Sequence, residues 1–110
     1  MRRATIILTL LFSAVACADG DPQPTVPDAH LESAKIDFAA RLQVAVDEIT
    51  VVEAEPVTWS SGAMGCAQSG GVYTPAEVEG YLIVLQYLTA VGNYHQGGDT
   101  PPFLCLSPTE

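Results

Sequence analysis

Few side chains in this sequence are suited to chemistry, and the most reactive combination joins Cys66, His95 and Asp99. A thiol, an imidazole and a carboxylate can form a nucleophilic set, in which the imidazole takes the thiol proton. No local signature surrounds these residues, and the sequence lacks phosphate-loop, HExxH and GxSxG patterns. His95 and Asp99 alone supply at most two ligands, fewer than a structural zinc ion requires. We therefore expect no catalytic residue, no metal site and no cofactor.

The N-terminal residues have the order of a secretory signal. Arg2 and Arg3 give a basic start, an apolar run follows, and small residues at positions 14–16 precede Cys17. The apolar run is shorter than the about 20 residues of a transmembrane helix. A cysteine at this place resembles the lipobox of bacterial lipoproteins, which implies cleavage before Cys17 and diacylglyceryl and palmitate-type chains on it. An ordinary signal peptide with an incidental cysteine is the alternative.

These features divide the chain into a signal peptide over 1–16, a lipidated tether over 17–28 and one domain over 29–107. The tether is rich in proline and aspartate and almost free of apolar residues, which is typical of flexible linkers. In lipoproteins of Gram-negative bacteria, an aspartate directly after the lipidated cysteine favours the inner membrane. Here Ala18 stands there and Asp19 follows. The resemblance therefore implies a cell-envelope protein, on the periplasmic side of the outer membrane if the source is Gram-negative.

Lipidation of Cys17 leaves two further cysteines, Cys66 and Cys105. In an oxidising compartment such a pair most simply forms one disulfide. The bond would close a loop of about 40 residues, which stabilises a folded chain by roughly 4 kcal/mol in the chain-entropy model. This matters for a domain of about 80 residues, because its core is small. The alternative is a pair of free thiols, one of them catalytic.

The charge balance limits the partners that this chain can bind. The full sequence has 13 acidic and 4 basic side chains, for a formal net charge of −9. Cleavage before Cys17 would remove Arg2 and Arg3 and leave two bases against 13 acids, a net charge of −11. Such a chain repels nucleic acids, whereas a basic protein partner remains possible. Glu53 and Glu55 share one face of an expected strand, but no spacing marks them as an acid/base pair.

Four ring-bearing residues are candidates for a binding surface: Trp59, Tyr73, Tyr94 and His95. Exposed aromatic side chains, with glycine-rich loops at their rim, are typical of protein-binding patches. The alternative is that the aromatic residues form the core, since a small domain must bury them. We expect the core role for Trp59 and Tyr81 in particular. The sequence leaves the choice open.

An amphipathic helix is predicted over residues 29–43, with Asp28 as its N-cap. Apolar residues recur there at helical spacing, and Asp37 precedes Arg41 by four positions. A strand is predicted over 49–55, bounded or bulged by Pro56, since proline cannot donate to a ladder. The small residues of 60–69 then form a loop.

The second half of the chain predicts more strands. Thr74-Pro75-Ala76-Glu77 has the pattern of a capping box, so one helical turn is expected over 75–79, ended by Gly80. Residues 81–87 and 91–96 form a predicted hairpin, and 103–106 a last short strand. The resulting fold class is α+β: one N-terminal helix on an antiparallel sheet of three or four strands, with one disulfide.

Several landmarks carry a further resemblance to a small secreted bacterial domain of exported and lipoprotein-like proteins. They are Trp59, Met64-Gly65-Cys66, Gly71-Val72-Tyr73, Gly80-Tyr81-Leu82-Ile83, Tyr94-His95 and Cys105, and the resemblance covers roughly 34–106. It implies the disulfide and the fold but no activity. The chain departs from the pattern at Gln43, where glycine is usual, and in the serines after Trp59. In outline the fold also resembles exported PepSY-type modules, which are linked to protease inhibition.

The expected function is that of a lipid-anchored, non-enzymatic lipoprotein of the cell envelope. It would bind a protein partner there, as an inhibitor or an accessory subunit. The alternative is a lipoprotein that binds a small molecule or a metal in a cleft between residues 75–79 and the 94–99 loop. An exposed aromatic patch would favour the first hypothesis, and convergent polar groups around a pocket would favour the second.

Overall fold

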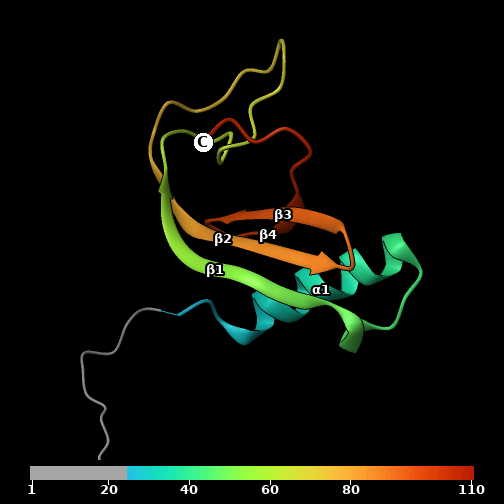
Figure 1. The fold of residues 1–110 in the computed structure, drawn as a ribbon. Coiled ribbons are helices and arrows are strands. Elements are labelled where there is room, and N and C mark those ends of the chain that lie inside the picture. Colours follow the sequence, from blue (N-terminus) through green and yellow to red (C-terminus); the bar gives the residue numbers. More distant parts are fainter. Residues whose placement is uncertain (1–24) are drawn as a thin grey trace, which may run out of the picture.

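The computed structural model describes residues 25–110, which form one helix packed on one antiparallel sheet (Figure 1). The predicted signal, the lipidation site Cys17 and the tether up to residue 24 lie outside the described residues. Helix α1 spans Asp28–Leu42, and a 3-10 turn, η1, spans Val46–Glu48. The strands are β1 (Thr50–Trp59), β2 (Val78–Tyr87), β3 (Ala90–Gly97) and β4 (Thr100–Leu104). The predicted α+β fold class is confirmed.

Helix α1 occupies the segment predicted from the apolar periodicity, with differences at both ends. Pro27 takes the cap position and Asp28 is the first helical residue, so Asp28 is not the predicted N-cap. The helix ends at Gln43, whose backbone is left-handed with φ of 60°, and whose N–H donates to Ala39 O and Ala40 O. Glycine adopts this conformation without strain. This explains why glycine is usual at position 43 in the domain that the sequence resembles.

The four strands form a meander in the order β1-β2-β3-β4, so β1 and β4 are the two edges of the sheet. Each neighbouring pair is antiparallel. A bulge between Val51 and Glu53 leaves Val52 as the extra residue of β1. Strand β1 runs without a break through Pro56 into residues 57–59, for which the sequence also predicts extended chain, and Pro56 is tolerated because β1 is an edge. Strand β4 begins at Thr100, earlier than predicted.

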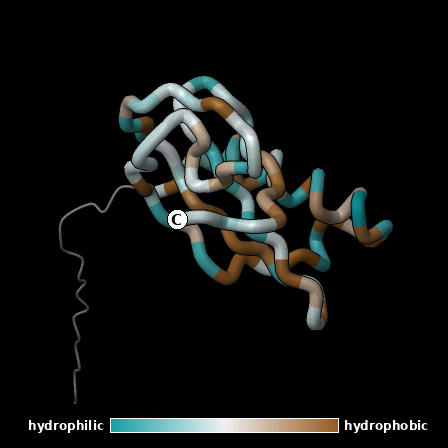
Figure 2. Tube along the Cα trace, turned by 90° about the horizontal axis from the view of Figure 1, so that it is seen from above, coloured by the Kyte–Doolittle hydropathy of each residue, from teal (hydrophilic) through white to brown (hydrophobic). Residues whose placement is uncertain are grey.

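The core lies between α1 and one face of the sheet. Ala34 and Phe38 from the helix pack with Ile83, Leu85 and Tyr94 from the central strands, and all five are buried. The Phe38 and Tyr94 rings meet edge to face, with centroids 6.1 Å apart. In Figure 2 the hydrophobic stretches run through the middle of the domain. The packed domain begins with Val26, which is buried in this core although the sequence assigned it to the tether.

The predicted helical turn over 75–79 is wrong. Residues 71–77 form an irregular loop, and β2 begins at Val78, so Gly80 is a strand residue rather than a helix stop. A Cβ atom at Gly80 would lie 1.8 Å from Gln96 O, because the two strands approach closely there. A single helical turn is costly to nucleate, and pairing of Val78 with Trp59 and of Gly80 with Val57 outweighs the capping signal.

The predicted disulfide between Cys66 and Cys105 is confirmed, with a Cα–Cα distance of 5.9 Å. Cys66 lies in the long loop of residues 60–77, and Cys105 directly follows β4. The chain after β4 also returns to this loop (Figure 1), where Thr109 N–H donates to Gly65 O at 2.7 Å and Ser60 hydrogen-bonds the Glu110 carboxylate. Among residues 25–110, no helix is long and apolar enough to cross a membrane.

Removing the disulfide should destabilise the domain strongly. It joins residues 39 positions apart, so replacing both Cys66 and Cys105 by serine should lower the free energy of unfolding by about 4 kcal/mol. Urea unfolding of the double variant measures this, with Cys17→Ser in every sample to prevent lipidation and Cys17→Ser alone as reference. A loss below about 1 kcal/mol would show that the loop is held in place without the bond.

Candidate functional site

Three of the four predicted surface residues lie in the interior. Trp59, Tyr94 and His95 are 3%, 0% and 1% exposed, and only Tyr73, at 37%, reaches the surface. The prediction of an exposed aromatic patch formed by these residues is therefore wrong in this structure. The alternative, that Trp59 is a core residue, agrees with its burial.

Trp59 and His95 form the centre of a second small core, on the face of the sheet opposite α1. Their rings stack with centroids 4.5 Å apart and planes within 13° of parallel. Trp59 Nε1 donates to Gln96 O at 2.8 Å. His95 Nδ1 lies 2.7 Å from Met64 O, and since a carbonyl only accepts, Nδ1 carries the hydrogen. Trp59 Nε1 and His95 Nδ1 thus both have a hydrogen-bond partner, and Met64 brings the 60–77 loop onto the two rings.

The glycines of this region allow the loop to approach the stacked rings. Gly65 has φ of +73°, and a Cβ atom there would lie 2.5 Å from Trp59 Cζ3. A Cβ atom at Gly97 would lie 2.6 Å from Met64 Sδ. Together with the neighbouring Cys66–Cys105 bond, these contacts bring six of the landmark residues into one packed unit: Trp59, Met64, Gly65, Cys66, His95 and Cys105. These landmarks thus have the structural role that the resemblance implies, whereas the stacking of Trp59 on His95 could not be predicted, because a pattern does not show which side a ring faces.

The predicted chemical candidates are used in other ways. The Cys66 sulfur is bonded to Cys105, so it is not a thiol nucleophile here. His95 is held by Met64 O and the Trp59 ring, and Asp99 lies in the turn between β3 and β4. Within residues 25–110, no three or more His, Cys, Asp or Glu side chains gather in a way that could hold a metal ion.

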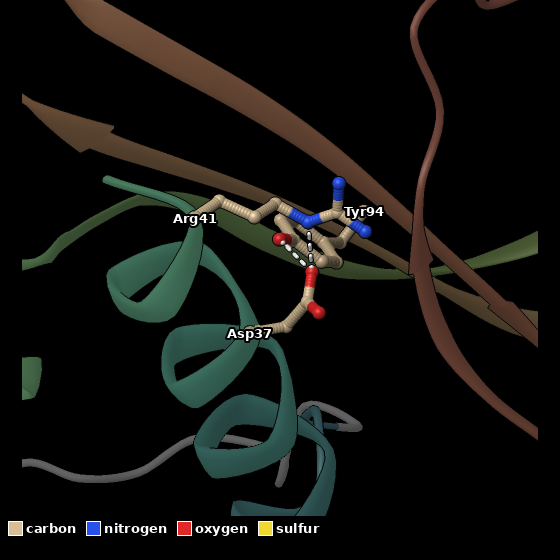
Figure 3. A network of polar contacts seen from close by, with 3 residues as sticks. All are labelled: Asp37, Arg41 and Tyr94. Carbon is tan, nitrogen blue, oxygen red and sulfur yellow. Dashed lines mark hydrogen bonds and ion pairs between the residues drawn. The ribbon is translucent and has the colours of Figure 1, made fainter. Parts of the chain in front are cut away.

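One polar network links α1 to the core (Figure 3). Tyr94 Oη and Arg41 Nε both donate to Asp37 Oδ2, at 2.5 and 2.6 Å. Partial burial alone would raise the pKa of Asp37, but the two hydrogen bonds and the positive charge of Arg41 outweigh it and lower that pKa below its ordinary value. Burial and the Asp37 carboxylate raise the pKa of Tyr94 far above the usual value for a phenol. The network orients the helix on the sheet.

The β1 side is the open part of the domain. Seven of the ten β1 residues are exposed, although the strand is hydrogen-bonded to β2 along its length. Helix α1 packs against β2, β3 and β4 and leaves β1 largely uncovered. The outer edge of β1 pairs with no strand of the described chain (Figure 1). This side combines a free edge with two accessible faces.

The direction of the free backbone groups follows from the register. Gly98 N–H donates to Glu79 O, so the backbone of Glu79 faces β3. Backbone direction alternates along a strand, and Gly80 therefore faces β1, where it pairs with Val57. Consequently the backbones of residues 55 and 57 face β2, whereas those of 54, 56 and 58 face outward. Pro56 places its missing N–H on the solvent side, as the rule for edge prolines requires.

A groove lies between β1 and the start of α1. It has a volume of about 620 Å³ and is lined by Thr25, Val26, Asp28, Leu31, Ala54, Glu55 and Pro56. A second cavity of about 380 Å³ shares Pro56 with the first and is lined also by His30, Glu79, Gly80, Tyr81, Gln96 and Gly98. It lies between the segments where the sequence placed a cleft. Three carboxylates line the two spaces, and no lysine or arginine does.

Gln96, which lines the second cavity, carries an unusual buried polar atom. Its amide nitrogen donates to Gly98 O and Thr100 O, both at 2.9 Å, so the orientation of the amide is fixed by two carbonyls. Its Oε1 atom is buried without a hydrogen-bond partner. An unsatisfied buried acceptor costs about 1–3 kcal/mol.

Because side chains alternate along a strand, those of Glu53 and Glu55 belong to the face of β1 opposite Ala54 and Pro56, while Glu55 also contributes to the lining of the groove at the strand edge. Glu53 and Glu55 are exposed and lie two positions apart on the strand, as the sequence predicts. The pKa of Glu53 is raised because its side chain hydrogen-bonds Glu55 and because the neighbouring negative charge disfavours its ionisation. A positively charged side chain beside them would offset the repulsion between the two carboxylates, so this face favours a basic neighbour.

Comparisons with known proteins give a family and no activity. A family model described as "Domain of unknown function (DUF8738)" matches residues 31–105, which include most of α1, the whole sheet and both disulfide cysteines. No curated protein matches the chain, and no solved structure matches it.

The structural role of the landmarks can be tested at Gly65. Gly65→Ala should lower the free energy of unfolding by about 1–3 kcal/mol more than Gly70→Ala, because only Gly65 has a ring where the methyl group must go. Gly70 is the matched control, since its φ is +81° and no atom lies within 4 Å of its Cβ position. Thermal and urea unfolding measure both. Equal effects would mean that only backbone conformation matters here.

The Asp37–Tyr94 network predicts how stability depends on pH. The folded-state pKa of Asp37 lies below the 3.8 of the free side chain, so its contribution is present above that pH and is lost as the pH falls further. The Asp37 side chain is 42% exposed, and solvent screening therefore limits the contribution to about 1 kcal/mol. Urea unfolding between about pH 2 and 6 should show a shallower acid slope for Asp37→Asn than for the wild type. Parallel slopes would contradict the assignment.

Proposed function

We propose that this chain, which belongs to the DUF8738 family of unknown function, is a lipid-anchored, non-enzymatic lipoprotein of the cell envelope. It binds a protein partner, as an inhibitor or an accessory subunit, through its β1 side. The anchor is the acylated Cys17, and the favoured location is the periplasmic face of the outer membrane if the source is Gram-negative.

The observation that carries the partner-binding proposal is the exposure of β1. A ten-residue strand with a free edge is a template for pairing, and small domains usually shorten or cover such an edge. Here α1 covers the other three strands instead. The aromatic patch predicted from the sequence is buried, so the binding surface is assigned to β1 in its place.

The course of the chain supports the same surface. Val26 lines the groove beside β1 and connects to the proposed anchor through residues 17–25. Nine residues span at most about 30 Å when fully extended. An anchor at Cys17 would thus keep the β1 side within a few tens of ångströms of the membrane surface. This distance suits a partner that is itself held in the envelope.

Photocrosslinking in living cells tests this function. A photoreactive residue at Val52 on β1 should capture one protein, whereas the same residue at Ile36 on α1 should not. The two positions are matched in exposure, at 54% and 52%. Cys17→Ser is the control without an anchor and should lose both metabolic palmitate labelling and at least tenfold of the Val52 product.

Two outcomes would contradict the proposal. Equal capture from Val52 and Ile36, or none from either, would remove β1 as the partner surface. Absence of palmitate label on the wild-type chain would remove the anchor.

The cavity beside Gln96 favours a second candidate, a small-molecule-binding lipoprotein. Gln96 and the His30 and Tyr81 rings, whose centroids are 5.7 Å apart, line this cavity, and polar and aromatic residues of this kind bind small ligands. A ligand screen by thermal shift, repeated on Tyr81→Ala, distinguishes this candidate from the first. A ligand that stabilises only the unaltered cavity would support it.

A further inference from the structure

We infer that β1 accepts an extended segment of a basic protein as a fifth strand, in which apolar and basic side chains alternate. This inference rests on the proposed function and specifies the partner's chemistry. It follows from three features of the segment between Ala54 and Thr58: its free backbone groups, the groove on one face and the carboxylates on the other.

The backbone offers a short and defined ladder. The N–H groups of Ala54 and Thr58 and the carbonyls of residues 54, 56 and 58 face outward, as the register requires. The bulge at Val52 limits this ladder on one side, and the 60–77 loop limits it on the other. An added strand therefore pairs over about five residues, the length of a common short strand.

The two faces of β1 specify different side chains. A residue of the added strand opposite Ala54 or Pro56 lies on the groove side, beside Val26 and Leu31, where an apolar side chain is favoured. The residues between them lie on the opposite face, next to Glu55 and within reach of Glu53. There a lysine or arginine would relieve the repulsion between the two carboxylates. Since side chains alternate along a strand, both preferences are met by one alternating sequence.

A second copy of this chain is a poorer occupant of the same edge. Pairing β1 with another β1 in antiparallel register would bring the Glu53–Glu55 carboxylates of two copies together, and like charges directly opposite destabilise a sheet. The described residues hold eleven acids but only two bases, Lys35 and Arg41, and both bases lie on α1. The chain itself thus offers β1 no basic strand.

The other edge of the sheet is less suitable. Strand β4 has five residues, and two of them, Pro101 and Pro102, cannot donate backbone hydrogen bonds. Helix α1 also packs against β4. Of the two edges, β1 is the longer and the less covered.

The test uses the Cys17→Ser chain and a seven-residue peptide that alternates valine and lysine, followed by nuclear magnetic resonance. The peptide should shift the amide signals of Ala54 and Thr58 and slow their hydrogen exchange. The same peptide with N-methylated backbone amides should bind at least tenfold more weakly, because it cannot form the ladder. A peptide with glutamate in place of lysine should behave in the same way, because it is repelled.

Two protein variants separate the backbone from the charges. The Ala54 N–H faces outward and makes no hydrogen bond to β2. Ala54→Pro removes this N–H, in the same way as proline already does at position 56. The fold should therefore persist, while binding weakens at least tenfold. Glu53→Gln with Glu55→Gln should weaken binding about three- to tenfold. Asp47→Asn with Glu48→Gln, in η1, removes the same charge elsewhere and should weaken it less than twofold.

The inference is overturned if the valine–lysine peptide does not bind, if it perturbs α1 rather than β1, or if Ala54→Pro binds it unchanged. Dimerisation of the protein through β1, detected by sedimentation, would show that a second copy, and not a basic segment, occupies this edge. Failure of the peptide together with strong crosslinking from Val52 in cells would leave the proposed function in place and refute only the strand addition. Failure of both the peptide binding and the Val52 crosslinking would refute the proposed function and the strand addition together.

Discussion

The stack of Trp59 on His95 is the interaction on which the outer half of this domain depends. It buries two large rings on the face of the sheet that α1 does not cover, and it needs the 60–77 loop above it to exclude water. Met64 O, Gly65 and the disulfide bring that loop into place. The sheet is thereby covered on both faces at one end, by α1 on one side and by the loop on the other. In a domain this small, these few contacts make up most of the second core.

With both faces covered at that end, most of β1 is the part of the sheet that neither α1 nor the loop covers. The helix is placed over β2, β3 and β4 by the packing of Phe38 and by the hydrogen bond from Tyr94 to Asp37. The loop covers the last residue of β1, Trp59, and leaves seven of the nine residues before it exposed. The openness of β1 is therefore a consequence of where the two covering layers are fixed. It is not a property of the β1 sequence alone, which is rich in β-branched and acidic residues.

Much of the fold could be predicted from local sequence patterns. The helix follows from apolar residues at helical spacing, and the disulfide from two cysteines in a chain for which the sequence predicts export. The turn predicted over 75–79 failed because its capping signal is local, whereas the pairing of Val78 with Trp59 joins distant segments. The burial of Trp59 agrees with the core role that the sequence favoured for it, whereas the burial of Tyr94 and His95 could not be predicted, since both are suited to a core and to a surface. The free edge of β1 depends on strand order, which no single segment encodes.

Hydrogen–deuterium exchange in native envelope preparations tests the central claim, that β1 is the surface on which this protein meets its partner. The purified Cys17→Ser chain gives the exchange rates of the free domain. The account predicts that peptides covering residues 50–59 exchange more slowly in the envelope than in the purified chain, whereas those covering 28–42 are unchanged. Identical exchange over 50–59 in the two samples, or protection confined to α1, would contradict it.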